Sequence, residues 1–167
     1  FEKLKLITMD IFFLFKNFNL NRCGISDYIS SLSLELLKNK VNPIILTDKK
    51  INFKLLSNQS VRVEWNFFKI IKQFSSRKKS IFFLQYSPFN YSNTGFSFIL
   101  IFLLLYLYFF KKEIKIVTNF HEIRNKFSVL PKYFLIYALH TIQFYIVYYL
   151  SKKIYYTNDS FVKNLKI

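Results

Sequence analysis

The chain has 167 residues, enough for one sizeable domain with a core of its own. Its formal net charge of +16 favours an anionic partner. Only 4 of its 25 basic residues are arginine, however, and base readout and bidentate phosphate contacts favour arginine, so the composition argues against a nucleic-acid partner. The single Cys23 excludes an internal disulfide and suits a reducing compartment, and with two distant histidines it predicts no metal site.

The first third of the chain has the pattern of a strand–helix–strand unit. Residues 4–8 are a short apolar run that predicts a strand, whereas residues 9–22 are aromatic and Asn-rich without a clear period. Residues 23–28 lead into a predicted helix that runs to about residue 39, and residues 41–47 predict the next strand. Pro43 near the start of that strand predicts an irregular or edge position, because proline donates no hydrogen bond to a ladder.

The same alternation continues to the end of the chain. The predicted strands are 61–64, 80–86, a run beginning at 114, and 153–157, and the predicted helices are 65–76, 96–110, 131–150 and one that starts at 158. This order predicts an α/β fold: a Rossmann-like, doubly wound parallel sheet with helices on both faces and right-handed crossovers. Residues 1–167 would form this single domain.

Two of the predicted helices are almost entirely apolar. Residues 96–110 would form a helix of about 22 Å, shorter than the roughly 30 Å hydrocarbon core of a bilayer. Residues 133–150 are long enough but carry His140, Thr141 and Gln143 at their centre. We therefore expect helices that pack on the sheet or lie on a membrane surface, with a membrane hairpin as the alternative.

The strand that begins at Ile114 runs out into the polar residues Asn119, His121 and Glu122. Ligands of open α/β sheets bind beyond the carboxyl ends of the strands, so these side chains are the best chemical candidates in the chain. His121 can hydrogen-bond a sugar hydroxyl or a phosphate, or act as an acid or base near neutral pH. Glu122 would orient it or cap the next segment. The alternative is a loop histidine without a chemical role.

Gly24 and Gly95 are the only glycines, and each stands just before a helix that follows a strand. Gly24 would let a ligand approach the backbone at a helix start, where free N–H groups and a partial positive charge suit a phosphate or diphosphate. The alternative is a glycine that only permits a tight loop. Ser26 or Asp27 would cap the same helix.

Four further residues bear on the same cleft. Gln85 and Tyr86 end a predicted strand and would line the cleft. His140, inside a helix, is assigned to packing or to the surface. Cys23 is interpreted as a bystander, although a thiol at a helix start can be reactive.

Taken in order, these pieces resemble the N-terminal half of a retaining glycosyltransferase with the GT-B fold, of the glycosyltransferase family 4 type. The resemblance covers nearly the whole chain. Cys23–Tyr28 is similar to the family's Gly-Ile-Gly-Asp-Tyr loop, and Val41–Thr47 to its V-x-V-L-T strand. The later stretches are Phe83–Pro88, Thr118–Glu122 and Tyr155–Asp159, which are similar to h-l-Q-Y-x-P, T-x-H-E and V-x-T-N strand ends.

The resemblance implies roles for individual residues. Gly24 and Ser26 would approach the diphosphate of a nucleotide sugar, and His121 would lie beside the transferred sugar as the catalytic residue. The cleft would be lined by Asp27, Tyr28, Gln85, Tyr86, Asn119, Glu122 and Asn158. The loop departs from the family pattern because Cys23 and Ser26 replace two glycines, which stiffens it.

The activity implied is transfer of a sugar, with retention, from a nucleotide sugar to a cell-surface glycan or lipid-linked acceptor, as in polysaccharide or lipopolysaccharide synthesis. No metal or other cofactor is expected, since helix ends and basic side chains can neutralise the leaving diphosphate. The family's nucleotide-sugar domain would follow residue 167, so residues 1–167 alone would be inactive. We expect a cytoplasmic protein whose apolar helices and lysines suit peripheral attachment to an anionic membrane surface.

Two other interpretations remain open. One is a non-enzymatic integral membrane protein with the two apolar helices as spans. The other is a different Rossmann-like nucleotide-binding enzyme, although the sequence contains no Gly-x-Gly-x-x-Gly and no Walker loop. A/T-rich codons alone would also enrich lysine and aromatic residues, so the charge does not by itself identify a partner.

Overall fold

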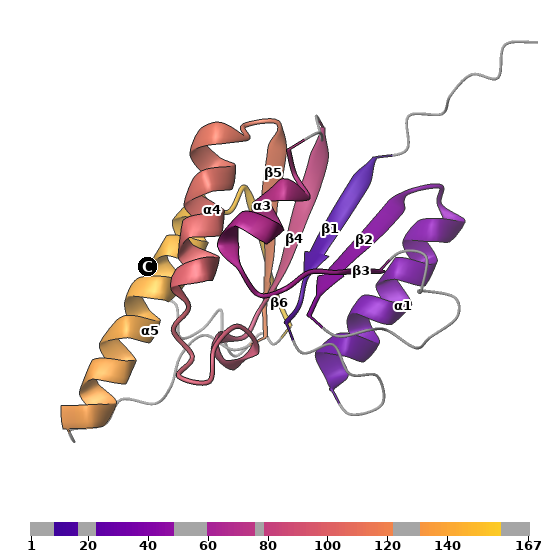
Figure 1. Cartoon of the computed structure of the whole chain (residues 1–167). Coiled ribbons are helices and arrows are strands. Elements are labelled where there is room, and N and C mark those ends of the chain that lie inside the picture. Colours follow the sequence, from indigo (N-terminus) through magenta and orange to yellow (C-terminus); the bar gives the residue numbers. More distant parts are fainter. Residues whose placement is uncertain (1–8, 17–22, 49–59, 76–78, 122–130, 158–167) are drawn as a thin grey trace, which may run out of the picture.

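The computed structural model describes residues 9–16, 23–48, 60–75, 79–121 and 131–157 (Figure 1). Within these ranges the strands are β1 (Asp10–Leu14), β2 (Asn42–Thr47), β3 (Ser60–Arg62), β4 (Ser80–Tyr86), β5 (Ile114–Phe120) and β6 (Lys153–Tyr156). The helices are α1 (Gly24–Lys38), α3 (Phe67–Lys72), α4 (Phe98–Phe110) and α5 (Pro131–Leu150), with a 3-10 turn at Pro88–Asn90.

The described strands form one parallel sheet in the order β3-β2-β1-β4-β5-β6. The chain moves outward from β1 to β2 and β3, crosses back to β4, and then continues outward to β5 and β6. The direction of winding therefore reverses between β1 and β4, which is the position where open α/β sheets bind ligands. The predicted α/β parallel sheet is confirmed, and it is consistent with a Rossmann-like fold.

β1 lies at the centre of the sheet, and its position corrects the sequence prediction. The strand predicted at 4–8 lies outside the described residues, while β1 falls within 9–22, where the sequence shows no clear period. The reason is burial on both faces. Phe12, Phe13 and Leu14 are all nearly inaccessible to solvent, so the strand lacks the apolar–polar alternation of a half-buried strand.

β2 is an internal strand, so the edge position predicted from Pro43 is wrong. Asn42 N donates to Met9 O over 3.1 Å, which places the backbone of Asn42 on the β1 side. Backbone groups alternate along a strand, so the nitrogen of Pro43 points to the β3 side. β3 pairs with β2 only from Ile45 onward, and Pro43 therefore costs the sheet no hydrogen bond.

Helices cover both faces of the sheet, as predicted (Figure 1). α1 packs on one face, where Ile29 joins Phe13 and Ile45 in one buried cluster. α3, α4 and α5 cover the other face, where Phe82 and Leu104 belong to a larger cluster. Successive residues of the central strands thus enter two different cores.

Polar side chains cap α3 and α4. α1 begins after Cys23 without a side-chain cap, so the cap predicted at Ser26 or Asp27, which lie inside the helix, is wrong. Asn66 precedes α3 and accepts two backbone N–H groups of its first turn, so α3 occupies only the middle of the predicted 65–76 helix. Ser97 caps α4 in the same way through the N–H of Leu100. The helix predicted from residue 158 lies outside the described residues. Among the helices that the structure describes, none combines the length and apolarity needed to span a membrane.

Candidate functional site

The carboxyl ends of β1, β4 and β5 and the start of α1 meet at one edge of the sheet. His121 is the first residue after β5, and its backbone N–H donates to Tyr86 O over 2.9 Å. This bond extends the pairing of β4 with β5 by one step and fixes the backbone of His121. The reversal between β1 and β4 opens at the same edge, because parallel strands end on one side.

Gln85, Asn119 and His121 form a polar cluster at this edge. Gln85 is fully buried, and its Oε1 lies 2.5 Å from His121 Nε2 and 3.1 Å from Asn119 Nδ2. An amide oxygen only accepts hydrogen bonds, so His121 Nε2 and Asn119 Nδ2 both donate to Gln85 Oε1. Gln85 therefore orients the ring, and the hydrogen bond from Asn119 Nδ2 holds the same Gln85 oxygen in place.

The first turns of α1 complete the candidate site. The half-exposed Tyr28 ring meets the His121 ring edge-on at 6.0 Å between centroids. Gly24 is the first residue of α1 and is exposed, and a Cβ added there would have no atom within 4 Å. The N–H groups of a first helical turn lack intrahelical partners and carry a partial positive charge, so the open space beside Gly24 suits an anion.

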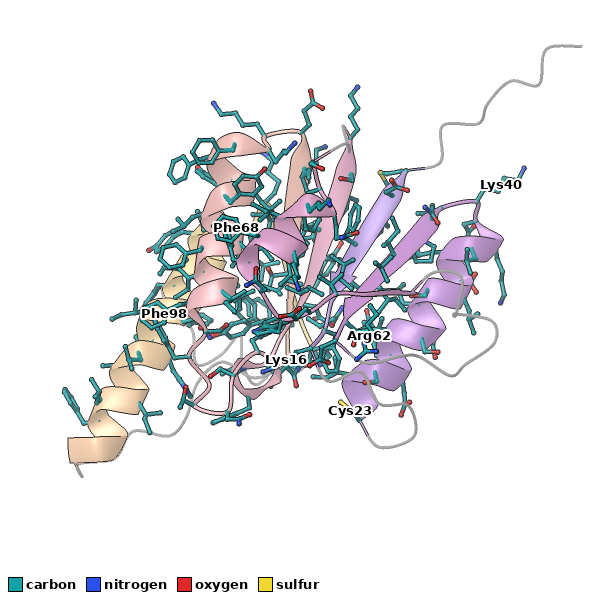
Figure 2. The ribbon with its side chains drawn as sticks, viewed as in Figure 1. Lys16, Cys23, Lys40, Arg62, Phe68 and Phe98 are labelled. Atoms are coloured by element: carbon teal, nitrogen blue, oxygen red, sulfur yellow. The ribbon has the colours of Figure 1, made fainter. Side chains whose placement is uncertain are left out.

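Two basic side chains add positive charge to this edge of the sheet. Lys16 follows β1, and Arg62 ends β3 (Figure 2). Lys16 Nζ lies 5.7 Å from the centre of the Trp65 ring, and Arg62 Nε donates to Asp48 O over 3.2 Å. The sequence analysis did not single out either residue, because single basic residues at strand ends do not stand out in a chain this rich in lysine.

Several predicted site residues occupy other positions. Ser26 is fully buried, so the structure exposes none of it at the cleft, and Asp27 is half-buried in the same turn. Tyr86 does not line the cleft: its ring lies in the core on the opposite face of the sheet, because it is one residue beyond Gln85 in a strand. Glu122 and Asn158 lie outside the described residues.

Tyr91 is a residue of the site that sequence analysis missed. Its hydroxyl lies 2.7 Å from Gln85 O and 3.3 Å from Leu14 O, so it bridges the ends of β4 and β1 at the reversal point. Its ring stacks on Trp65 at 6.0 Å. Because Tyr91 sits in a loop and belongs to no apolar period, the sequence carries no signal for this role.

A groove of about 670 Å³ runs from the cluster along the part of the sheet that α1 leaves uncovered. Asn119 and Tyr28 lie at the end nearest His121. The floor and walls are mostly apolar and include Phe13, Leu32, Leu36, Ile81, Phe83 and Val117. The arrangement can therefore hold an apolar group beside a polar, hydrogen-bonding end.

His140 is a core residue, which decides between the packing and surface positions that the sequence analysis left open for it. It is fully buried, and its Nε2 donates to Thr94 O over 2.9 Å. Gln143, one turn later, accepts the N–H of Ser97 at 2.7 Å and donates to Gly95 O at 3.0 Å. These bonds fasten the loop before α4 to α5 and take no part in the candidate site.

The cluster at the sheet edge offers a histidine, an aromatic ring and a helix start, which together suit hydrogen bonding to hydroxyl and phosphate oxygens. Within the described ranges, no group of three or more His, Cys, Asp or Glu residues is placed to hold a metal ion. A scan against protein-family models found no match, and neither did searches of curated proteins and of solved structures.

Proposed function

We propose that this chain is the N-terminal, acceptor-side domain of a glycosyltransferase with the GT-B fold, which transfers a sugar from a nucleotide sugar to a glycan or lipid-linked acceptor. The observation that carries the proposal is the meeting of His121, Gln85 and Tyr28 beside the start of α1, at the reversal point of a parallel sheet. Both the position and the residue types suit a ligand with sugar and phosphate groups.

In this proposal the N–H groups at the start of α1 contact the diphosphate, and Lys16 and Arg62 add positive charge at the same edge. His121 contacts the transferred sugar. The hydrogen bond to Gln85 fixes the orientation of the imidazole ring, whose nitrogens suit hydrogen bonding to a sugar hydroxyl. The largely apolar groove beside Asn119 suits the hydrocarbon part of a lipid-linked acceptor.

The resemblance to family 4 glycosyltransferases supports the same assignment. The start of α1 and the strand end at His121 are the stretches of this half that the resemblance places beside the donor, and both lie at the same edge of the sheet. Family members hold the nucleotide sugar mainly in a second domain. We therefore expect residues 1–167 to bind a diphosphate weakly and to transfer no sugar.

An NMR titration of the ¹⁵N-labelled chain tests the proposal. Added pyrophosphate, and a panel of nucleoside diphosphate sugars, should shift the amide signals of Gly24, Ile25, Tyr28 and His121. The parent nucleosides, which lack phosphate, serve as the control and should shift them little. Gly24→Pro removes one of the N–H donors and should weaken the response to pyrophosphate. Shifts confined to other parts of the sheet, or sustained sugar transfer by the chain alone, would contradict the proposal.

A further inference from the structure

The outward face of α4 is apolar. Phe98, Phe102 and Phe109 recur at helical spacing along it, and each exposes more than half of its surface, from 55% at Phe102 to 65% at Phe98 (Figure 2). None of the 13 residues of α4 is charged. A helix on the surface of a soluble domain normally turns polar residues outward. The solvent-facing side of α4 therefore exposes apolar residues where polar residues are expected.

α5 continues this surface beside α4. Leu135, Ile142 and Tyr149 lie on one side of α5 and are 52% to 70% exposed. The two helices contact each other on the same face of the sheet (Figure 1). Their outward residues thus form one apolar surface, which we call the α4–α5 face. Contiguous exposed apolar surfaces of this kind mark contacts with proteins or membranes.

Lysines gather at one end of the α4–α5 face. A hollow of about 660 Å³ lies where both helices end, and it is lined by Lys112, Lys115 and Lys152 together with Phe109 and Tyr149 of the face. All three lysines are exposed. The adjacent Glu113 does not line the hollow. Positive charge and exposed aromatic rings therefore share one site.

We propose that the α4–α5 face binds the surface of an anionic lipid bilayer, with headgroup phosphates in the lysine hollow and the aromatic side chains in the membrane interface. Lysine at the headgroups and apolar or aromatic residues below them are the arrangement of interfacial helices. A second copy of the chain fits less well. In a two-fold contact the α4–α5 face of one copy packs on the α4–α5 face of the other, so each lysine hollow would meet the same apolar and lysine-bearing surface. This inference goes beyond the proposed function and does not depend on it.

Vesicle co-sedimentation of the purified chain tests the inference. Vesicles of phosphatidylcholine are compared with vesicles of phosphatidylcholine and phosphatidylglycerol, at low and at high salt. We expect binding to the anionic vesicles only, weakened by salt.

Paired variants locate the surface. Lys112→Gln with Lys152→Gln should weaken binding about 30-fold, because each lysine near an anionic surface contributes about fivefold. Lys38→Gln with Lys40→Gln makes the same change of charge at the end of α1, which packs on the opposite face of the sheet, and should leave binding intact. Phe109→Gln should weaken binding by about fivefold or more, since it removes buried apolar area in the bound state. Tyr155→Gln, on the opposite face of the sheet, is its control.

Three outcomes would overturn the inference. The first is no binding to either vesicle, and the second is equal binding to both. The third is equal loss in the Lys112 and Lys38 pairs, which would show that net charge rather than this surface attracts the protein. Gel filtration of the same variants tests whether the face binds a second copy of the chain instead. A dimer that dissociates in the Phe109→Gln variant, in a protein that does not bind vesicles, would assign the face to a second copy.

Discussion

Tyr86 and Tyr91 carry buried hydroxyl groups whose ionisation opposes folding. Burial raises the pKa of Tyr86, and a hydrogen bond from Gln143 offsets part of that shift. Burial, and then the charge of Tyr86, raises the pKa of Tyr91 well above its usual value of 10.0. Both folded-state pKa values exceed those of the unfolded chain. The two neutral hydroxyl groups therefore contribute fully to the stability of the fold below about pH 10, and this contribution is lost as the pH rises further.

The unfolding free energy should accordingly fall above pH 10, by about 1.4 kcal/mol per pH unit for each of the two hydroxyls. Tyr91→Phe removes one of these groups, so the stability of the variant should fall less steeply. Urea unfolding followed by circular dichroism at a series of pH values from 8 upward measures both slopes. Parallel curves for the two proteins would show that Tyr91 does not ionise on unfolding.

At the scale of elements, the loop before α4 depends on a close approach to α5. Gly95 has a φ of +78°, and a Cβ there would lie 2.1 Å from His140 Nε2. A side chain would therefore meet both an unfavourable backbone conformation and a buried ring that is already held by Thr94 O. Gly24, in contrast, is helical and open to solvent.

The two glycines make a matched pair of substitutions. Gly95→Ala should lower the unfolding free energy by about 2 to 4 kcal/mol through strain and displacement of His140. Gly24→Ala should leave it within about 1 kcal/mol of the wild type, on the stabilising side, because alanine favours a helix and restricts the unfolded chain. Chemical denaturation measures both. Equal effects of the two substitutions would contradict the close contact between the loop and α5.

The elements show which features of a fold a single sequence carries. Helical spacing and apolar runs were enough to predict the parallel sheet and the helices on both faces. They failed at β1, because a strand buried on both sides has no alternation to detect. They also failed at Pro43, where the decisive fact is how far β3 extends along β2. That length depends on the partner strand and not on the proline.

The candidate site also combines features that the sequence could predict with features that it could not. A histidine at the end of β5 and a glycine at the start of α1 were visible in the sequence, because strand ends and helix starts are local features. Whether Gln85 or Tyr86 faces the cleft depended on the register of β4, since neighbouring residues point to opposite faces. The bridge made by Tyr91 joins residues far apart in the chain, and no local pattern encodes it.

At the scale of the whole molecule, the candidate site and the lysine hollow of the α4–α5 face lie at opposite ends of β5. His121 follows the carboxyl end of β5, whereas Lys112 and Lys115 flank its start. The seven residues of β5 separate them by roughly 20 Å. A bilayer held at the α4–α5 face would therefore leave the candidate site uncovered while keeping it near the lipid surface, where a lipid-linked acceptor would be found.

The most direct test of the account is sugar transfer by the protein encoded by the complete reading frame. Release of nucleoside diphosphate is measured from a panel of nucleotide sugars with lipid-linked and glycan acceptors, for the wild type and for His121→Ala. We expect acceptor-dependent release by the wild type and a loss of about 100-fold or more in the variant, because a residue that contacts the reacting sugar commonly contributes that much. Circular dichroism of the variant checks that it is folded. Equal rates for wild type and a folded His121→Ala protein, or no release from any nucleotide sugar, would contradict the account.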